Sequence, residues 1–204
     1  LYQDEIKLKT NFNFIDYEAL SKFLDNNIYQ IEKLIGEFVK NIFIIIENKE
    51  NLNIKIGNKK KNFENLINQK NLKNTLVELK NLVTENYQDQ TIIHIILINY
   101  MINGKKYSTF KENIKGNFFS LEVSFITLSN DLIVKLNKCL QKYQIEISRY
   151  FDGNYIKSFS KEEKHNLSIT ANKLNNGFID NEIIIVPKNI KKKGFFERFF
   201  NFFG

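Results

Sequence analysis

Hydrophobic and polar positions along the chain repeat with two different periods, and the change from one to the other separates helices from strands. A helical period runs from residue 20 to 38 and again from 66 to 82, which predicts two amphipathic helices. Asp16 is placed to cap the first of them, and Glu18 lies in its first turn. A weaker alternation over residues 1–14 predicts a short lead-in strand.

Strands are predicted where apolar residues alternate with polar ones or form a short continuous run. The clearest alternation lies in residues 118–126, where Phe119 faces one side and Ser120 the other. Asn103-Gly104 follows the longest apolar run, and this dipeptide is typical of a type I′ turn that leads into a return strand. The predicted strands are residues 41–46, 52–56, 91–102, 118–126 and 144–150.

A third amphipathic helix is predicted between the last two strands, so the fold class is expected to be α+β, with a mixed or antiparallel sheet packed on two or three helices. We expect this domain to cover residues 15–150. The lysine run at 59–61 is predicted to be a solvated turn or loop. Residues 151–194 are predicted to be a flexible polar and basic linker, with a short helix within 160–176 and a short strand at 182–186.

The last residues have the most one-sided pattern in the chain. At 100° per residue the six phenylalanines of residues 195–203 lie within an arc of about 160°, and the polar residues lie opposite them. A helix over 195–204 is too short to span a bilayer, which takes ~20 apolar residues, but it suits the membrane interface. The alternative is a terminal helix docked on the core of its own domain. The residues expected to bind the membrane, with a basic lead-in that favours anionic lipids, are Lys188, Lys191, Lys192, Lys193, Phe195, Phe196, Arg198, Phe199, Phe200, Phe202 and Phe203.

The chain has 204 residues and a net charge of +7, which by itself would suggest a nucleic-acid partner. Arginine is the residue that makes forked contacts to bases and phosphates, yet only Arg149 and Arg198 are arginines among the 30 basic residues. We therefore expect no nucleic-acid partner. The single cysteine, Cys139, excludes a disulfide within these residues, and the first residues lack the apolar stretch of a signal peptide, which favours a cytoplasmic location.

No group of residues indicates catalysis. His94 and His165 are not accompanied by carboxylates at metal-ligand spacing. His94 is interpreted as a satisfied core or sheet-surface imidazole, and Cys139 as a small hydrophobic residue rather than a nucleophile. The eight glycines are scattered and form no phosphate-binding loop. We therefore predict a protein that is not an enzyme, with no catalytic, cofactor-binding or metal-binding residues and no small-molecule substrate.

Five stretches of the chain occur in an order that is typical of one protein family. They are IDYEAL at 15–20 ahead of the first helix, TIIHII at 91–96 with YMING at 100–104, GNFFSLEVSFIT at 116–127, LNKC at 136–139 before QIEI at 144–147, and GFFERFF at 194–200. Together they resemble the FtsA family of bacterial cell division proteins.

The resemblance implies a small strand-helix-strand-strand domain, which in this family is inserted into a larger protein and contacts neighbouring protomers and later division proteins. It also implies a C-terminal membrane-targeting helix on a basic linker. The actin-like ATP-binding lobes of the family have no counterpart in this sequence, so nucleotide binding and docking of the FtsZ tail are not implied. We expect a non-enzymatic adaptor that binds peripherally to the cytoplasmic face of the inner membrane at the division site. Its expected partners are anionic lipids of the inner membrane, divisome proteins and further copies of itself.

Three other interpretations stay open. A PilM-like adaptor of pilus or secretion assembly would share the inner-membrane face, although a Phe-rich C-terminal helix is not expected in that relative. A basic nucleic-acid-binding module would bind DNA or RNA with a steep salt dependence. A degenerate ATPase would bind nucleotide in a direct titration.

Overall fold

A computed structural model of the 204-residue chain describes residues 2–6, 15–47, 51–107, 110–111, 113–159, 167–179 and 181–183. Residues 2–6 contain no helix or strand, and the rest of the predicted lead-in strand, residues 7–14, lies outside the described residues. The predicted helix over 195–204 and its basic lead-in also lie outside them. The chain divides into two compact units, which are Leu1–Ile44 with Asp131–Tyr150, and Ile45–Asn130 with Phe151–Gly204.

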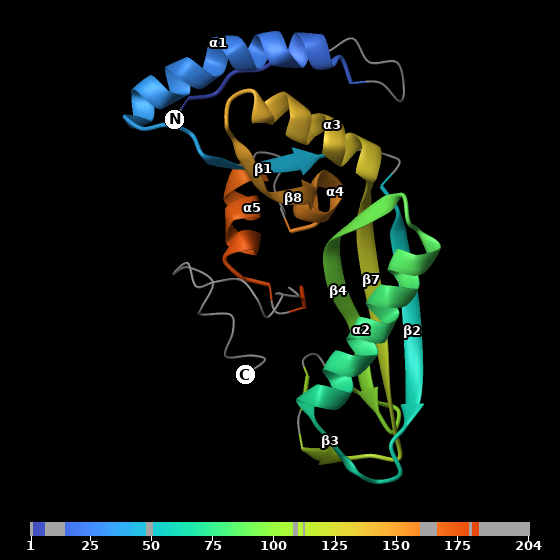
Figure 1. Ribbon diagram of the computed structural model, residues 1–204. Coiled ribbons are helices and arrows are strands. Elements are labelled where there is room, and N and C mark those ends of the chain that lie inside the picture. The colour runs from blue at the N-terminus through green and yellow to red at the C-terminus, as the bar shows by residue number, and fades with distance from the viewer. Residues whose placement is uncertain are drawn as a thin grey trace. The chain divides into compact units, whose positions relative to one another are not determined.

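The larger unit is built on a four-stranded antiparallel sheet with the order β2-β7-β4-β5 (Figure 1). The central strand β7 spans Phe118–Ser129 and pairs along its length with β4, Gln90–Ile102. The edge strands are β2, Asn53–Lys61, and the short β5, Lys105–Tyr107. The predicted α+β class is confirmed, and the sheet is antiparallel.

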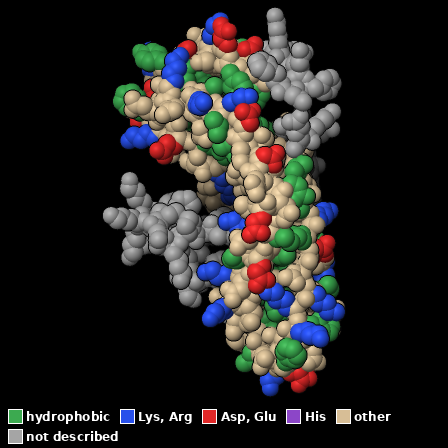
Figure 2. Space-filling view, turned by 45° about the vertical axis from the view of Figure 1, so that its right-hand side comes forward, with side chains coloured by type: hydrophobic (Ala, Val, Ile, Leu, Met, Phe, Trp, Pro, Cys, Tyr) green, Lys and Arg blue, Asp and Glu red, His purple; other side chains and the backbone are tan. Residues whose placement is uncertain are grey.

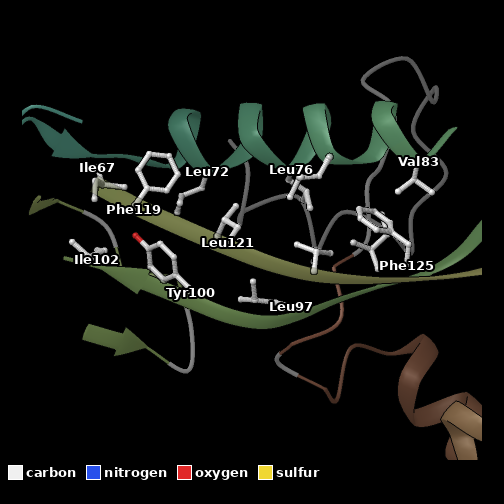
Figure 3. Close-up of a cluster of buried hydrophobic side chains, with 13 residues drawn as sticks. Ile67, Leu72, Leu76, Val83, Leu97, Tyr100, Ile102, Phe119, Leu121 and Phe125 are labelled. Carbon is white, nitrogen blue, oxygen red and sulfur yellow. The ribbon is translucent and has the colours of Figure 1, made fainter. Parts of the chain in front are cut away.

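The helix α2, Gln69–Asn86, covers one face of this sheet. It begins at a capping box in which the side chains of Asn68 and Asn71 each bind the other's backbone N–H, so that two otherwise unpaired donors are satisfied. Between helix and sheet lies the main hydrophobic core (Figure 3). Its buried residues are Ile67, Leu72, Leu76, Leu79, Val83, Ile95, Leu97, Tyr100, Ile102, Phe119, Leu121, Val123 and Phe125.

The two central strands contribute to this core in different ways. In β7 every second residue from Phe119 to Phe125 is buried, which confirms the predicted apolar face, but from Val123 to Leu128 the residues of both faces are buried, so the predicted polar face is exposed only in the first half of the strand. In β4 the buried positions change from odd numbers at Ile95 and Leu97 to even numbers at Tyr100 and Ile102, because the register shifts between Leu97 and Asn99. The extra residue of a β-bulge moves the following side chains to the other face. A second shift lies between Ile92 and His94.

Three short segments close the end of the sheet at which β2 and β4 end and β7 begins. The turn after β4 has Asn103 at φ 48° and Gly104 at φ 81°, which confirms the predicted turn with two positive φ angles. The strands β3, Leu66–Ile67, and β6, Ile114–Lys115, pair with each other at this end. The lysines at 59–61 belong to β2 and pair with β7, so the prediction of a turn there was wrong. Lys60 faces α2, where its ammonium pairs with Glu78 at 2.5 Å.

Residues 151–179 carry more structure than the predicted linker. They contain α4, Gly153–Lys157, and α5, Leu167–Asn175, which is the short helix expected within 160–176. Beyond them a single β-bridge joins Glu182 to Ile96, and residues 184–186 of the predicted strand lie outside the described residues. Together with Phe151, which precedes α4, the two helices form a second buried cluster in this unit, whose helical members are Ile156, Ala171 and Leu174.

The smaller unit contains α1, Tyr17–Ile35, and α3, Asn130–Gln141, of which residues from Asp131 belong to this unit. As predicted, the Asp16 side chain caps α1 by accepting a hydrogen bond from the Ala19 N–H, and α1 ends at Gly36 with φ 75°. The strands β1, Asn41–Ile46, and β8, Glu146–Asp152, pair in a two-stranded sheet. Large apolar side chains at the end of α1 stay exposed, among them Leu34, Ile35 and Phe38.

Replacement of a core leucine tests how much the contact between α2 and the sheet stabilises the larger unit. Leu76→Ala should lower the free energy of unfolding by about 3 kcal/mol, because it leaves a cavity under a buried helix. Urea denaturation followed by circular dichroism measures the change. The matched control is Val77→Ala on the exposed face of the same helix, which should change stability by less than about 0.5 kcal/mol. Equal effects of the two variants would contradict the described packing.

Candidate functional site

The residues predicted to bind the membrane, from Lys188 to Phe203, all lie outside the described residues. The structure therefore neither places them nor tests their role. Among the described helices, none combines the length and apolar character needed to cross a membrane. The described part of the chain offers two other features that bear on function: a group of buried polar side chains, and the open edge of the sheet.

The buried polar cluster, as we call it, consists of His94, Glu182, Asp152 and Asn51, all within the larger unit. His94 lies on β4 with 2% of its surface exposed, and its Nδ1 is 2.6 Å from Glu182 Oε1. Its Nε2 accepts a hydrogen bond of 3.0 Å from the Asp152 backbone N–H. A backbone N–H can only donate, so Nε2 carries no proton and the neutral imidazole donates from Nδ1 to the Glu182 carboxylate.

Asp152 extends the cluster to the start of α4. One carboxylate oxygen accepts a hydrogen bond of 2.7 Å from the Tyr155 N–H and so caps α4. The other accepts a bond of 2.6 Å from the Asn51 side-chain amide. The rings of Phe151 and Tyr155 lie 5.8 Å and 4.6 Å from the imidazole, measured between centroids. The cluster is therefore enclosed by aromatic rings and joined by hydrogen bonds to four segments of the chain.

A histidine beside a carboxylate is also the arrangement of a general base. Here both ring nitrogens are already engaged and the imidazole is buried, so its lone pair is not presented to a substrate. The cluster instead holds residues 181–183 beside β4, on the side of that strand that does not pair with β7. The Leu97 N–H donates to the Asn181 carbonyl at 2.8 Å, and the Ile183 N–H donates to the Ile95 carbonyl at 2.7 Å.

The interpretation of His94 as a satisfied core imidazole is confirmed. Its partner Glu182 was not predicted, because 88 residues separate the two and no local pattern connects them. Cys139 is partly buried, and desolvation raises the pKa of its thiol, as expected for a packing residue. Across the described ranges there is no group of three or more His, Cys, Asp or Glu side chains suited to a metal ion.

The second feature is the free edge of the sheet at β2. No other strand of the described residues pairs with the outer side of β2. Its side chains alternate, with Ile54 and Ile56 packed towards α2, and with Lys55 and Lys59 exposed on the opposite face. Lysines on an edge strand discourage unselective pairing between sheets. A partner that adds to this edge would therefore have to offer acidic or polar side chains beside the lysines.

The other edge of the sheet is largely occupied. Strand β5 pairs only with the last three residues of β4, from Tyr100 to Ile102. Residues 181–183 cover the middle of β4 through the two backbone hydrogen bonds described above. Among the described residues, β2 thus forms the long open edge of the larger unit, and the three-residue β5 leaves only a short one.

In the smaller unit, one carboxylate links α1 to the residues that follow α3. Asp25 accepts hydrogen bonds from the Lys142 ammonium at 2.8 Å and from the Tyr143 hydroxyl at 2.8 Å. These bonds favour the charged carboxylate, and the hydrogen bond from Lys142 is the main reason that the pKa of Asp25 is lowered, with Tyr143 second. The Ser21 carbonyl lies 3.0 Å from the same Tyr143 hydroxyl oxygen, so the one hydroxyl hydrogen is shared between the two acceptors.

Comparisons with known proteins add no assignment, since no family model matches the chain and a search of curated proteins finds no relative. The functional interpretation consequently depends on the residues and geometry described above.

The buried polar cluster can be tested by removing the imidazole while keeping a ring in place. His94→Phe should lower the free energy of unfolding by about 2–4 kcal/mol, because a buried carboxylate and a backbone N–H lose their partner. Glu182→Gln keeps an acceptor for Nδ1–H and should therefore lower the free energy of unfolding by a smaller amount. Amide exchange measured by NMR should speed up at Ile183 in the His94 variant. Unchanged exchange there would show that the cluster does not hold residues 181–183.

Asp25 gives the smaller unit a defined pH dependence. A lowered pKa in the folded state means that Asp25 contributes stability above its unfolded pKa of about 3.9 and that this contribution is lost as the pH falls through the folded pKa. The stability curves of the wild type and Asp25→Asn should therefore differ at neutral pH and converge in acid. Urea titrations at a series of pH values measure this. Curves that stay parallel down to about pH 2 would rule out the effect.

Proposed function

We propose that this protein is a non-enzymatic adaptor of the FtsA-like type, which holds a protein-interaction domain at the cytoplasmic face of the bacterial inner membrane, at the site of cell division. The observation that carries this assignment is the order of the main elements in the larger unit. Strand β2, helix α2 and strands β4 and β7 follow one another along the chain, α2 covers one face, and β7 lies between β2 and β4. The resemblance to the FtsA family implies a domain with this same order of elements.

Two of the five stretches that carry the resemblance lie in this arrangement of strands. Residues 91–104 form β4 and its tight turn, and residues 118–127 lie in β7. The resemblance implies strands at both places, and this agreement supports the assignment. The larger unit is then the part that would meet other division proteins, with the free edge of β2 as its available strand.

Attachment to the membrane is assigned to the phenylalanine-rich segment of residues 195–203 and the lysines before it. Six aromatic rings on one side of a helix would enter the interface between headgroups and acyl chains, while the lysines would stay near anionic headgroups. A single anchor of this size binds reversibly, so two or more copies of the chain on one surface would stay bound much longer than one. Self-association is therefore part of the proposed function.

Vesicle co-sedimentation tests the anchor. The full chain should pellet with vesicles that contain phosphatidylglycerol, and a chain that ends at Ile190 should stay largely in the supernatant at physiological salt. A full-length variant with Phe199→Glu and Phe200→Glu should behave like the shortened chain, because two charges on the apolar face oppose insertion.

The matched control changes the polar side of the same segment. Glu197→Gln with Asn201→Gln should bind vesicles about as well as the wild type. If the shortened chain and the full chain pellet equally, the segment is not the anchor. A fluorescent fusion that fails to gather at the division site would contradict the assigned process even where the anchor is correct.

A further inference from the structure

We propose that the end of the larger unit remote from α4 and α5 makes a second, separate contact with anionic phospholipid membranes. This surface, called the basic tip from here on, consists of three segments: the end of β2 with the turn to β3 (59–66), the turn after β4 with β5 (103–107), and the described residues from 110 to the end of β6 at 115. The inference goes beyond the proposed function, because it does not need the C-terminal segment.

Strand pairing places these three segments at one end of the sheet. Lys61, the last residue of β2, is the partner of Phe118, the first residue of β7. The Asn62 N–H and the Phe63 N–H both donate to the Asn117 carbonyl, at 2.7 Å and 3.3 Å. Leu66 of β3 is the partner of Lys115 of β6. The turn between β4 and β5 adjoins them, because the Asn103 side chain accepts hydrogen bonds from the Asn117 and Phe118 N–H groups.

Phe63 stands at the outermost turn with 77% of its surface exposed. Its backbone has φ 50°, and the next residue, Glu64, has φ 59°, a region that side chains other than glycine seldom adopt. The turn is held by Asn62, whose buried amide donates to the Asn65 carbonyl at 2.6 Å and to the Gly116 carbonyl at 3.1 Å. This backbone therefore holds a large apolar ring in solvent at the end of the sheet, where it is available for a contact outside the chain.

The residues around this ring are basic. Segments 59–66 and 105–115 contain seven lysines against two glutamates, and they contain no arginine. Leu66, beside the turn, is 51% exposed and adds a second apolar side chain. Figure 2 shows apolar and basic side chains together with an acidic one at the lower end of the larger unit. The exposed lysines of the basic tip are Lys59, Lys61, Lys105, Lys106, Lys111 and Lys115.

An apolar ring surrounded by lysines suits a lipid surface better than a protein or a nucleic acid. Protein interfaces are depleted in lysine at their centre, and nucleic-acid sites favour arginine for its forked contacts. A bilayer accepts a single ring among its headgroups while long lysine side chains reach anionic phosphates around it. Lysines that only protect an edge strand from pairing would not require an exposed phenylalanine at the end of that strand.

A second contact would also change how long the protein stays on a membrane. One small anchor gives reversible binding, and stable attachment takes two signals, such as an apolar anchor with a basic patch. The basic tip supplies charge and one ring from a folded surface. It would therefore favour membranes rich in anionic lipid and would respond to salt, because surface charges are screened as ionic strength rises.

Fluorescence tests insertion directly, because the chain has no tryptophan of its own. In the full chain, Phe63→Trp should show a blue-shifted emission and quenching by brominated lipid when vesicles of phosphatidylcholine with phosphatidylglycerol are added. Vesicles of phosphatidylcholine alone should leave it unchanged. The control is Leu82→Trp, which is also exposed but lies in the last turns of α2. A Phe63→Trp spectrum that changes no more than the control overturns the inference.

Affinity separates the basic tip from the C-terminal anchor. In the full chain, Lys61→Glu with Lys115→Glu should weaken binding to the anionic vesicles at least about twentyfold, since each lysine near such a surface counts for about fivefold. Lys80→Glu with Lys173→Glu, matched in charge and in the same unit, should have a much smaller effect. A loss no larger than that of the control overturns the inference and leaves the C-terminal anchor untouched.

The same variants placed on the background of Phe199→Glu with Phe200→Glu complete the test. Residual binding at low salt that disappears with Lys61→Glu and Lys115→Glu supports the basic tip. If the C-terminal variant binds as well as the wild type and the tip variant does not, the basic tip is correct and the proposed anchor is wrong. Loss of DNA-duplex binding in the tip variant, with vesicle binding unchanged, would overturn the inference in favour of a nucleic acid.

Discussion

The larger unit depends on the burial of one face of β7 beneath α2. Four alternate residues of β7, from Phe119 to Phe125, are almost completely buried and form the centre of the main core. A shift of one residue in this strand would move all four to the opposite face of the sheet, away from α2, so the burial of one face also sets the register of the strands on either side. The two bulges of β4 follow from the same constraint, because they let a 13-residue strand keep its apolar residues on the buried face although their spacing is irregular.

The bulge beside Ile92 also decides where the polar cluster forms. His94 pairs with Ile126, a neighbour in sequence of the core residue Phe125, so its imidazole lies on the side of the sheet away from α2. There it meets Glu182 and the Asp152 N–H, and it connects β4 to the segment that leads towards the C-terminus. Burial of the imidazole lowers the stability of the fold only slightly, because each ring nitrogen has a hydrogen-bond partner. Residues 181–183, which follow α5, are in this way bonded to β4.

The two proposals assign different roles to two surfaces of the larger unit. Partner binding is assigned to the open edge of β2, and a second membrane contact to the basic tip at the end of the same strand. Both use the fact that β2 is an edge strand with lysines on its exposed face. If the basic tip rests on a membrane, the edge of β2 rises from that surface and stays accessible to another protein. The exposed apolar end of α1 is a separate feature of the smaller unit, to which no partner is assigned.

Local pattern determined much of the secondary structure. The cap at Asp16, the bounds of β1, the alternation in β7, the turn at Asn103 and the satisfied state of His94 were all predicted from sequence, because each depends on neighbouring residues or on one side chain's chemistry. The anchor over residues 195–204 stays a prediction from sequence. The tertiary structure alone decided that the lysines at 59–61 extend β2, that α4 forms and packs with the predicted helix α5, and that Glu182 pairs with His94. It also brought Phe63 and distant lysines to one end of the sheet. These outcomes arise from pairing between segments far apart in the chain, and such pairing leaves no period in the sequence that connects them.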